Sequence, residues 1–432
     1  MATLNLSSRL KSLAGHRLVR NSAALYGVQA AHFVFPLITL PYLARVLRPA
    51  EFGLVLLAQS TGSLVNLLID YGFGGSAVRR TAQARDDGDV LADAVAGVLG
   101  AKTVLTLGSG VIVVFALALS PLQHHPGYLL LAWLGAVASG LNPWWYFLAL
   151  ERLPSASAIE VVTRGIAVVL TLVWVRTTHD GWKVLLLVAL GSLAGLALVT
   201  WRVYREVAFR LPRRSLVIDA LRDGWYIFAA TVAVTLYTAA NVMILGFFVT
   251  TVQVAFFAGP ERIVRAILRL TGPLVQAVYP RISLLVSQGE NRRARRLAKV
   301  AVLAIVVPCT VGAMITFVLA GPIVDLVLGP GYGPAVAVLR ILVLIVPVVA
   351  LGSGIGVGWL LPNRLDRTIT RTVAVGGVLN LALAPIAAPI LGPVGMALAV
   401  LAAESTVMVL ILVAARRSGV FALSEPAQPA AV

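Results

Sequence analysis

The sequence has few charged residues and almost no cysteine. Only 12% of its 432 residues are charged and 59% are hydrophobic, with a mean hydropathy of +0.92, whereas soluble domains carry roughly 25% charged residues. Cys309 is the single cysteine, which excludes an internal disulfide. The five histidines show no metal-ligand spacing, so no metal site is expected. This composition excludes an ordinary soluble domain and predicts a membrane protein.

The sequence also lacks a segment that would hold a soluble catalytic domain, because no stretch between its apolar runs exceeds about 25 residues. Gly97–Thr103 approaches a phosphate-binding loop, but Ala101 separates Gly100 from Lys102 and the glycine spacing is wrong. We therefore expect no cofactor, and an enzyme is disfavoured.

Long apolar runs are the dominant feature of the chain. A membrane-spanning helix needs about 20 apolar residues. Twelve such stretches predict an all-α polytopic membrane protein with twelve transmembrane helices: 21–43, 52–75, 96–119, 127–150, 155–176, 182–201, 224–248, 252–280, 298–320, 335–361, 370–390 and 393–415. No cleavable signal peptide is evident, so the first run is expected to remain as the first span.

The formal net charge of +17 reflects topology rather than nucleic-acid binding. Most of the 35 lysines and arginines fall at the two ends and in alternate loops. The opposite side carries only Arg45, Arg48, Arg176 and Lys183. Because positive loops stay in the cytoplasm, both termini are predicted to be cytoplasmic.

The longest and most basic loop divides the chain into two halves of six spans each. The predicted parts are a basic leader, either interfacial or solvated, an N-lobe, a linker, a C-lobe and a disordered tail, at residues 1–20, 21–202, 203–222, 223–417 and 418–432. Transporters are often built from such repeated halves. Pro36 and Pro41 should bend the first span near its outer end and are candidate hinges.

Arg262, Arg265 and Arg269 lie inside an otherwise apolar span, and their spacing places them on one helical face. An arginine near the bilayer midplane costs on the order of 2.5 kcal/mol or more, so it normally faces water, a partner charge or a ligand. Arginine suits phosphate or carboxylate recognition. Glu261 points about 100° away from Arg262 and is not expected to neutralise the whole face. An anionic substrate is therefore favoured over structural pairing.

The remaining charges inside predicted spans are candidates for binding or coupling. Lys102 and Arg164 are further candidate substrate-binding residues, although Glu160 and Arg164 are spaced to pair on one helix, and charge neutralisation is the favoured interpretation there. Asp70, His32 and Glu261 are candidate coupling or gating residues. For His32 and Asp70, a hydrogen-bonded packing role is favoured.

Several motifs, taken in their order along the chain, resemble the Wzx-type polysaccharide flippases, which move O-antigen or exopolysaccharide repeat units and belong to the PST family of the MATE-like MOP superfamily. The matching segments are 36–47, Glu51-Phe52-Gly53, 70–73, 76–80, 142–147 ending in Glu151, Glu261-Arg262-Ile263, 279–283, 328–332 and 339–342.

The resemblance implies two six-helix lobes around a central cavity lined mainly by spans 1, 2, 7 and 8. It implies transport of an undecaprenyl-pyrophosphate-linked oligosaccharide from the cytoplasmic to the periplasmic leaflet of the bacterial inner membrane. The arginines would hold the pyrophosphate or acidic sugars. Tyr26, Trp225, Tyr226 and Tyr237 are candidate sugar contacts, with interfacial anchoring as the alternative. The protein is expected to function as a monomer, in contact with lipid and other polysaccharide assembly proteins.

Two other functions remain open at this point. A MATE-type drug or cation exporter would share the fold, but cationic substrates favour an acidic cavity, and the predicted spans hold more basic than acidic residues. A membrane-embedded polysaccharide polymerase or ligase usually needs a sizeable outside loop, and none is present.

Overall fold

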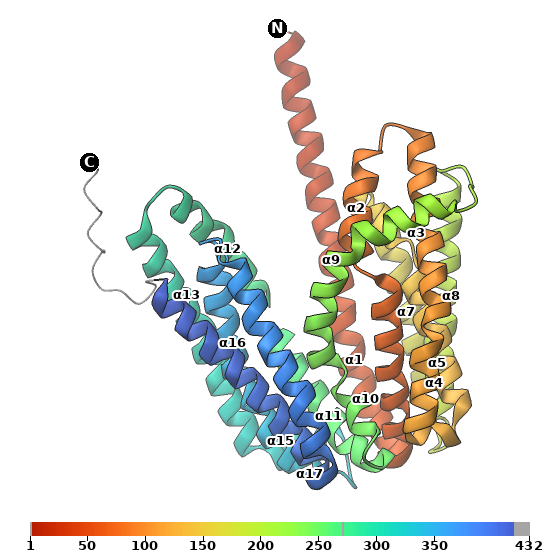
Figure 1. Ribbon diagram of the computed structural model, residues 1–432, viewed down its shortest axis with the longest axis vertical. Coiled ribbons are helices and arrows are strands. Elements are labelled where there is room, and N and C mark those ends of the chain that lie inside the picture. Colours follow the sequence, from red (N-terminus) through yellow and green to blue (C-terminus); the bar gives the residue numbers. More distant parts are fainter. Residues whose placement is uncertain (1, 270–271, 419–432) are drawn as a thin grey trace. The chain divides into compact units, whose positions relative to one another are not determined.

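The computed structural model describes the backbone of residues 2–269 and 272–418, with the side chains of 2–25, 233–234, 236–239, 273–274 and 277 left out. Every regular element in the described part is helical (Figure 1). The α-helices are α1 (Ala2–Asp70), α2 (Phe73–Gln83), α3 (Gly88–Gly108), α4 (Gly110–Leu119), α5 (Pro126–Leu141), α6 (Trp144–Ala149), α7 (Leu153–Trp174), α8 (Gly181–Tyr204), α9 (Arg214–Ala239), α10 (Asn241–Gly246), α11 (Thr251–Arg269), α12 (Gly272–Ser287), α13 (Asn291–Val318), α14 (Ala320–Val327), α15 (Ala335–Val343), α16 (Ile345–Ile355) and α17 (Asp366–Arg417). A 3₁₀ turn, η1, covers Pro121–His124, and a π-helical turn, η2, covers Gly356–Leu360.

Seven stretches in the described part are long and apolar enough to cross a membrane: Tyr26–Gln83, Gly88–Leu119, Leu153–Trp174, Gly181–Tyr204, Asn291–Val318, Ala335–Leu360 and Asp366–Arg417. The predicted all-α polytopic membrane protein is therefore confirmed. The number of twelve spans stays a prediction. The first and last stretches, of 58 and 52 residues, far exceed the roughly 20 residues of one crossing.

The chain forms two compact units. The N-unit comprises Met1–Thr235 with Thr250–Ala255, and the C-unit comprises Leu236–Val249 with Phe256–Val432. The lobe and linker boundaries predicted from the sequence remain predictions.

The first arm of α1 lies along α7 in the N-unit. His32 lies beside Glu160 near the start of α7, with 3.0 Å between His32 Nε2 and Glu160 Oε1. Farther along the arm, the Tyr42 hydroxyl donates to the Leu172 carbonyl oxygen at 2.9 Å, near the end of α7. The arm ends at Arg48, whose φ of 57° and ψ of 171° are not helical.

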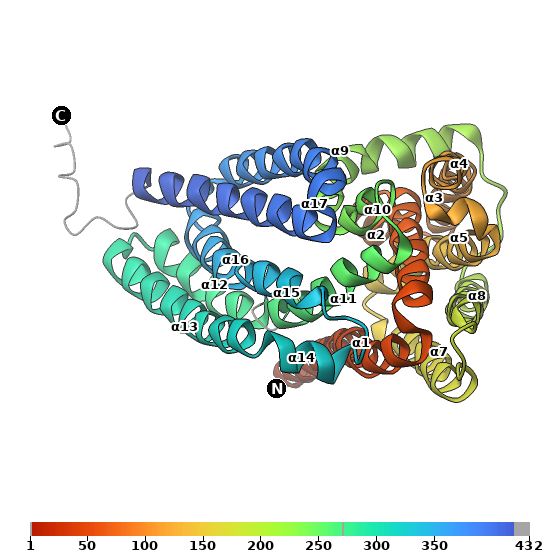
Figure 2. The ribbon, with the colours of Figure 1, turned by 90° about the horizontal axis from the view of Figure 1, so that it is seen from below.

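The second arm of α1 runs back along α5. Its beginning is held by Glu51, which accepts a hydrogen bond from the Tyr128 hydroxyl at the start of α5. Its end packs on Gly140, where an added Cβ would lie 2.7 Å from Ile69 Cγ2. The absence of that Cβ lets the two helices approach closely. Seen end-on in Figure 2, α3, α5, α8 and α7 follow one another around the N-unit, as their mutual contacts require.

In the C-unit, α17 is a helical hairpin that turns at Gly392, which has a φ of 57° (Figure 1). A Cβ on Gly395 would clash with the Ala387 carbonyl oxygen, and one on Gly376 would clash with Val407. The two arms therefore approach closely, with backbone against backbone at Gly395 near the turn and with Val407 packed on Gly376 farther from it. Helix α16 packs on both α13 and α17 and completes the core of this unit.

The prolines of the first span lie inside regular helix. Pro36 and Pro41 are both within α1, and the non-helical residue of this element is Arg48, seven residues after Pro41. The reversal of the chain at Arg48 is thus separate from the two prolines, and their role as hinges stays a prediction.

Candidate substrate-binding site

The arginine face of α11 belongs to the C-unit. Arg265 donates to Glu261 Oε1 through Nη2 at 2.6 Å and through Nε at 3.1 Å. Glu404 on α17 also interacts electrostatically with Arg265. Arg262 and Arg265 are half-buried, whereas Arg269 is exposed. Arg265 is therefore oriented by the carboxylate of Glu261 on its own helix.

The Glu261–Arg265 pair was missed by sequence reasoning, which compared Glu261 only with Arg262. The signal was available, since residues four apart on a helix are neighbours. Glu261 thus pairs with one arginine of the face, Arg265, and the use of the face as an anion-binding site stays a prediction.

Lys102 is enclosed in the N-unit and is not positioned to meet a substrate in this conformation. Its side chain is 1% exposed, and Nζ donates to the Gly140 carbonyl oxygen at 2.5 Å. Asp70 Oδ1 lies 3.6 Å from Nζ, and the Phe73 ring centroid lies 5.7 Å away. The ammonium thus joins α3 to α5 and to the end of α1, and Lys102 contributes to the packing of these three helices. Asp70 is its ionic partner.

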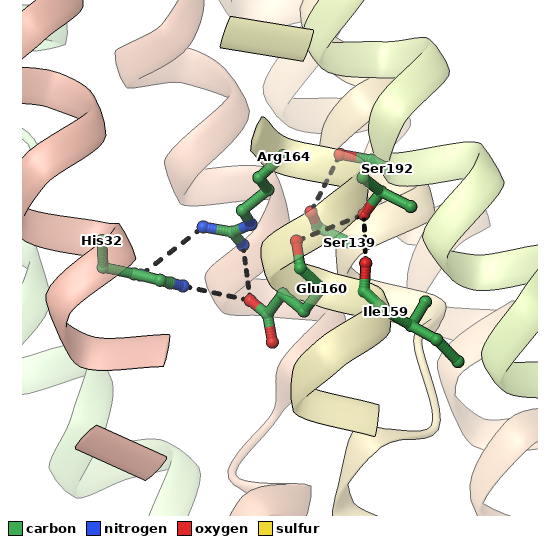
Figure 3. Close-up of polar contacts among 7 residues, drawn as sticks. His32, Ser139, Ile159, Glu160, Arg164 and Ser192 are labelled. Carbon is green, nitrogen blue, oxygen red and sulfur yellow. Dashed lines mark hydrogen bonds and ion pairs between the residues drawn. The ribbon is translucent and has the colours of Figure 1, made fainter. Parts of the chain in front are cut away.

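Arg164 meets its predicted partner and one further residue. Its Nη2 lies 3.0 Å from Glu160 Oε1, as the spacing of four predicts. His32 of α1 joins them, with Nε2 3.0 Å from the same Oε1 and Nδ1 3.5 Å from Arg164 Nη1 (Figure 3). Two separately proposed residues, His32 and Arg164, are thus brought together by Glu160.

The candidate sugar-contacting aromatic residues are exposed where their side chains are described. Tyr26 is 68% exposed, Trp225 52% and Tyr226 83%. The Trp225 ring lies 6.1 Å from that of Phe228. Exposure of this kind fits either a sugar contact or anchoring at the membrane interface. The side chain of Tyr237 lies outside the described residues.

Ion pairs that the sequence did not indicate fix the basic loop after α8. Arg210 forms an ion pair with Asp89 at the start of α3, and its Nη1 lies 2.9 Å from Asp93 Oδ1. Its pKa is raised, first by the hydrogen bond to Asp93. Arg152 donates to Glu206 Oε2 at 2.8 Å. These contacts tie residues far apart in sequence, so no local spacing could have signalled them.

In the described part of the chain, no three His, Cys, Asp or Glu side chains gather as a metal ion would require.

The sequence matches the family described as polysaccharide biosynthesis protein over residues 18–286. The chain belongs to this family. Two curated relatives, each named "Putative O-antigen transporter", match it almost from end to end. The protein of Escherichia coli (strain K12) is 27% identical over 414 residues, which cover 93% of this chain and 97% of the relative. The protein of Shigella dysenteriae is 24% identical over 408 residues, covering 92% and 100%.

Solved transporter structures share the fold. The lipid II flippase MurJ, in an inward closed conformation, matches with a TM-score of 0.66 and 14% identity, covering 92% of this chain and 87% of that one. An inward-facing multidrug resistance MATE transporter of the MOP superfamily matches with a TM-score of 0.64 and 14% identity, covering 93% and 100%. The chain shares its fold with these transporters, and the resemblance to polysaccharide flippases seen in the sequence is confirmed by the family match.

Proposed function

We propose that this protein is a flippase that moves an oligosaccharide repeat unit, linked through pyrophosphate to undecaprenol, from the cytoplasmic to the periplasmic leaflet. The product would supply surface polysaccharide biosynthesis. Two observations support the proposal most directly. The chain belongs to a family of polysaccharide biosynthesis proteins, and one of its predicted spans carries three arginines on one helical face. The relatives named as O-antigen transporters and the fold shared with a lipid II flippase support it.

The chemistry of the arginines fits the lipid-linked head group. A pyrophosphate presents several anionic oxygens, which guanidinium groups bind through paired hydrogen bonds. Arg262, Arg265 and Arg269 are the proposed ligands, with Arg265 oriented by Glu261 at 2.6 Å. The Lys102 ammonium is enclosed and contacts Asp70 and the Gly140 carbonyl, so its role as a ligand stays a prediction.

The proposed transport cycle is alternating access. The binding site opens to the cytoplasm, takes up the head group, and then opens to the other side while the lipid tail remains in the bilayer. Sugar rings would stack on exposed aromatic residues such as Tyr26, Trp225 and Tyr226. A membrane potential, negative inside, would favour outward movement of the anion by about 2.3 kcal/mol per charge per 100 mV.

The proposed location is the bacterial inner membrane, with both termini in the cytoplasm. This orientation follows from the distribution of lysine and arginine between alternate loops. The proposed functional unit is a monomer in contact with membrane lipid, which receives its substrate from other polysaccharide assembly proteins.

Deletion of the gene in its host tests the proposal. Polyprenol-linked sugars would be extracted and surface polysaccharide assayed, with and without the gene on a plasmid. We expect lipid-linked oligosaccharide to accumulate on the cytoplasmic side and surface polymer to be lost. Normal polymer together with altered sensitivity to cationic drugs would reject the proposal in favour of a MATE-type exporter.

A further inference from the structure

A groove in the N-unit lies between α3 and α8, which both pack on α5. Its volume is about 440 Å³. Besides the end of α5, its walls are Leu99 and Thr103 of α3 and Leu193, Leu196, Ala197 and Thr200 of α8. On each helix these residues are three or four apart, so they form one face of that helix. The groove is therefore built from two facing, mainly apolar helix surfaces.

The groove opens toward the lipid. Exposed apolar side chains continue from its edges along both helices, as they do where a membrane-spanning helix meets hydrocarbon. They are Val104 and Leu107 on α3 and Leu190 and Leu198 on α8, which are 52%, 79%, 50% and 45% exposed. An occupant of this groove would accordingly enter from the bilayer.

The depth of the groove matches the acyl chains of one leaflet. The predicted spans 96–119 and 182–201 meet the same side of the membrane at residues 96 and 201. At 1.5 Å per residue, the walls of the groove lie within about 12 Å of these boundaries, and half of a hydrocarbon core is about 15 Å thick. The distribution of lysine and arginine predicts that this side is cytoplasmic.

The segment 205–213 crosses the end of the groove on this side, on its way from α8 to α9 (Figures 1 and 2). The Phe209 ring packs edge-on against Tyr204 at the end of α8, with 5.4 Å between the ring centroids. The next residue, Arg210, reaches α3, where its Nη1 lies 2.9 Å from Asp93 Oδ1. The segment is thus fastened to both walls.

Pro212 brings the start of α9 beside the groove. A Cβ added to Gly100 would lie 2.5 Å from Pro212 Cβ, so the proline packs directly on α3 next to Leu99. Arg213 and Arg214 follow at once, and both are exposed. Two guanidinium groups therefore stand beside the groove at the level where lipid head groups begin.

This end of the groove carries an excess of positive charge. Glu206 is the one acidic residue between 202 and 214, and it pairs with Arg152. Within the part of the chain that the structure describes, the exposed arginines without an acidic partner here are Arg202, Arg205, Arg213 and Arg214. The cytoplasmic leaflet is rich in anionic lipid, and basic pockets between spans on this side bind anionic head groups.

The same segment also carries exposed apolar residues. Phe209 is 68% exposed and Leu211 77%. Apolar side chains placed among arginines are typical of a segment that rests in the membrane interface. The charge beside the groove therefore faces lipid head groups.

We propose that the groove between α3 and α8 binds a phospholipid with an anionic head group. One acyl chain lies against Leu99, Leu193 and Leu196, and the phosphate is bound by Arg213 and Arg214. The bound lipid joins both walls of the groove to the start of α9. The inference does not depend on the proposed transport function, and it assigns a membrane component, not the transported substrate, to this site.

The test is a lipid titration of the purified, delipidated full-length protein, followed by native mass spectrometry. The probes are dioleoylphosphatidylglycerol and dioleoylphosphatidylcholine, which share their acyl chains and differ in head-group charge. We expect one phosphatidylglycerol to bind each chain, about fivefold or more tightly than phosphatidylcholine, because a basic residue near an anionic lipid contributes about that factor.

Two variants assign the binding to the groove. Ala197→Phe fills it and should bind phosphatidylglycerol no better than the wild type binds phosphatidylcholine. Ala118→Phe, at an exposed alanine of α4 outside the groove, is the matched control and should bind as the wild type does. Ala197→Leu replaces Ala197→Phe if the latter is not monodisperse.

A third variant tests the head-group contacts. Arg213→Gln combined with Arg214→Gln should weaken phosphatidylglycerol binding by about fivefold per arginine removed and leave phosphatidylcholine binding unchanged. Arg416→Gln combined with Arg417→Gln changes another adjacent, exposed pair, at the end of α17, and should have no effect.

Equal binding of the two phospholipids by the wild type would overturn the proposal, as would equal binding by Ala197→Phe and Ala118→Phe. Undecaprenyl phosphate is the third probe. If it binds more tightly than phosphatidylglycerol and is lost in Ala197→Phe, the groove belongs to the tail of a polyprenyl lipid and the phospholipid assignment is rejected. Loss of surface polymer on gene deletion bears on the flippase proposal alone.

Discussion

Lys102 Nζ donates a hydrogen bond of 2.5 Å to the carbonyl oxygen of Gly140, 38 residues away. The contact joins α3 to α5 at a depth where neither group has access to bulk water, since the Lys102 side chain is 1% exposed. A lysine that the sequence offers as a substrate ligand is thus part of the packing between helices.

Replacement of Lys102 by methionine should destabilise the protein without a specific loss of transport. The substitution leaves the buried Gly140 carbonyl without this donor, at a cost of about 1–3 kcal/mol. We expect a lower melting temperature in detergent and export that scales with the amount of folded protein. Lys299→Met, near the start of α13, is the control. Full stability combined with abolished export would restore Lys102 as a substrate ligand.

Replacement of Gly140 by alanine should destabilise the same region by steric overlap. The new Cβ would lie 2.7 Å from Ile69 Cγ2 and 3.3 Å from Asn66 Oδ1. Such overpacking typically costs about 1–3 kcal/mol. Gly127→Ala in the same helix meets nothing within 4 Å and should leave the melting temperature unchanged or slightly higher. Equal melting temperatures for the two variants would contradict the close packing of α1 on α5.

Replacement of both Arg262 and Arg265 by alanine should abolish export while the protein remains in the membrane. Two guanidinium groups that bind pyrophosphate would be lost, and we expect export to fall more than tenfold. Export would be measured as surface polysaccharide in a deletion strain, with the protein quantified in the membrane fraction. Arg296→Ala, an exposed residue of α13, is the control. Normal polysaccharide in the double variant would contradict the hypothesis that these arginines bind the substrate.

Asp180 should make stability depend on pH in the acid range. Burial by itself would raise the pKa of Asp180, but the Lys183 ammonium and the backbone N–H groups of Arg176 and Thr177 hold it well below the usual value. Nζ of Lys183 lies 2.7 Å from Oδ1. A depressed folded-state pKa stabilises the protein above the unfolded value, about 3.9, and the contribution is lost as the pH falls through the folded value.

The measurement for Asp180 compares the melting temperatures of the wild type and Asp180→Asn from pH 7 down to pH 2.5. The wild type should be the more stable protein at pH 7, and the difference should shrink below about pH 4. Asp86→Asn, at a side chain 96% exposed, should show little difference at any pH. A gap that stays constant across the range would show that the carboxylate charge is not what matters.

The sequence predicted most of what depends on local periodicity. The continuous apolar runs predicted an all-helical membrane protein, and the spacing of four between Glu160 and Arg164 predicted their ion pair, found at 3.0 Å. The same rule applied to Glu261 and Arg265 would have predicted the pair at 2.6 Å. Apolar periodicity and side-chain spacing on a helix are properties of one segment, so a sequence contains them directly.

Contacts between distant segments could not be predicted in this way. His32 meets Glu160 across 128 residues, and Lys102 meets the Gly140 carbonyl across 38 residues. The reversal at Arg48 requires a positive φ in a residue that is not glycine. The following Pro49 disfavours helical geometry at Arg48, but it does not predict a positive φ. The exposure of each charged side chain depends on helix packing, which decides that Lys102 is enclosed and Arg164 is not.

The most direct test of the account is translocation by the purified protein in proteoliposomes. A fluorescent undecaprenyl-pyrophosphate-linked oligosaccharide would be placed in both leaflets, and its movement measured by its access to an enzyme added outside. The account predicts that the wild type moves the lipid between leaflets and that the Arg262/Arg265 double alanine variant does not. A rate equal to that of protein-free vesicles for wild-type protein that is folded and inserted would contradict it.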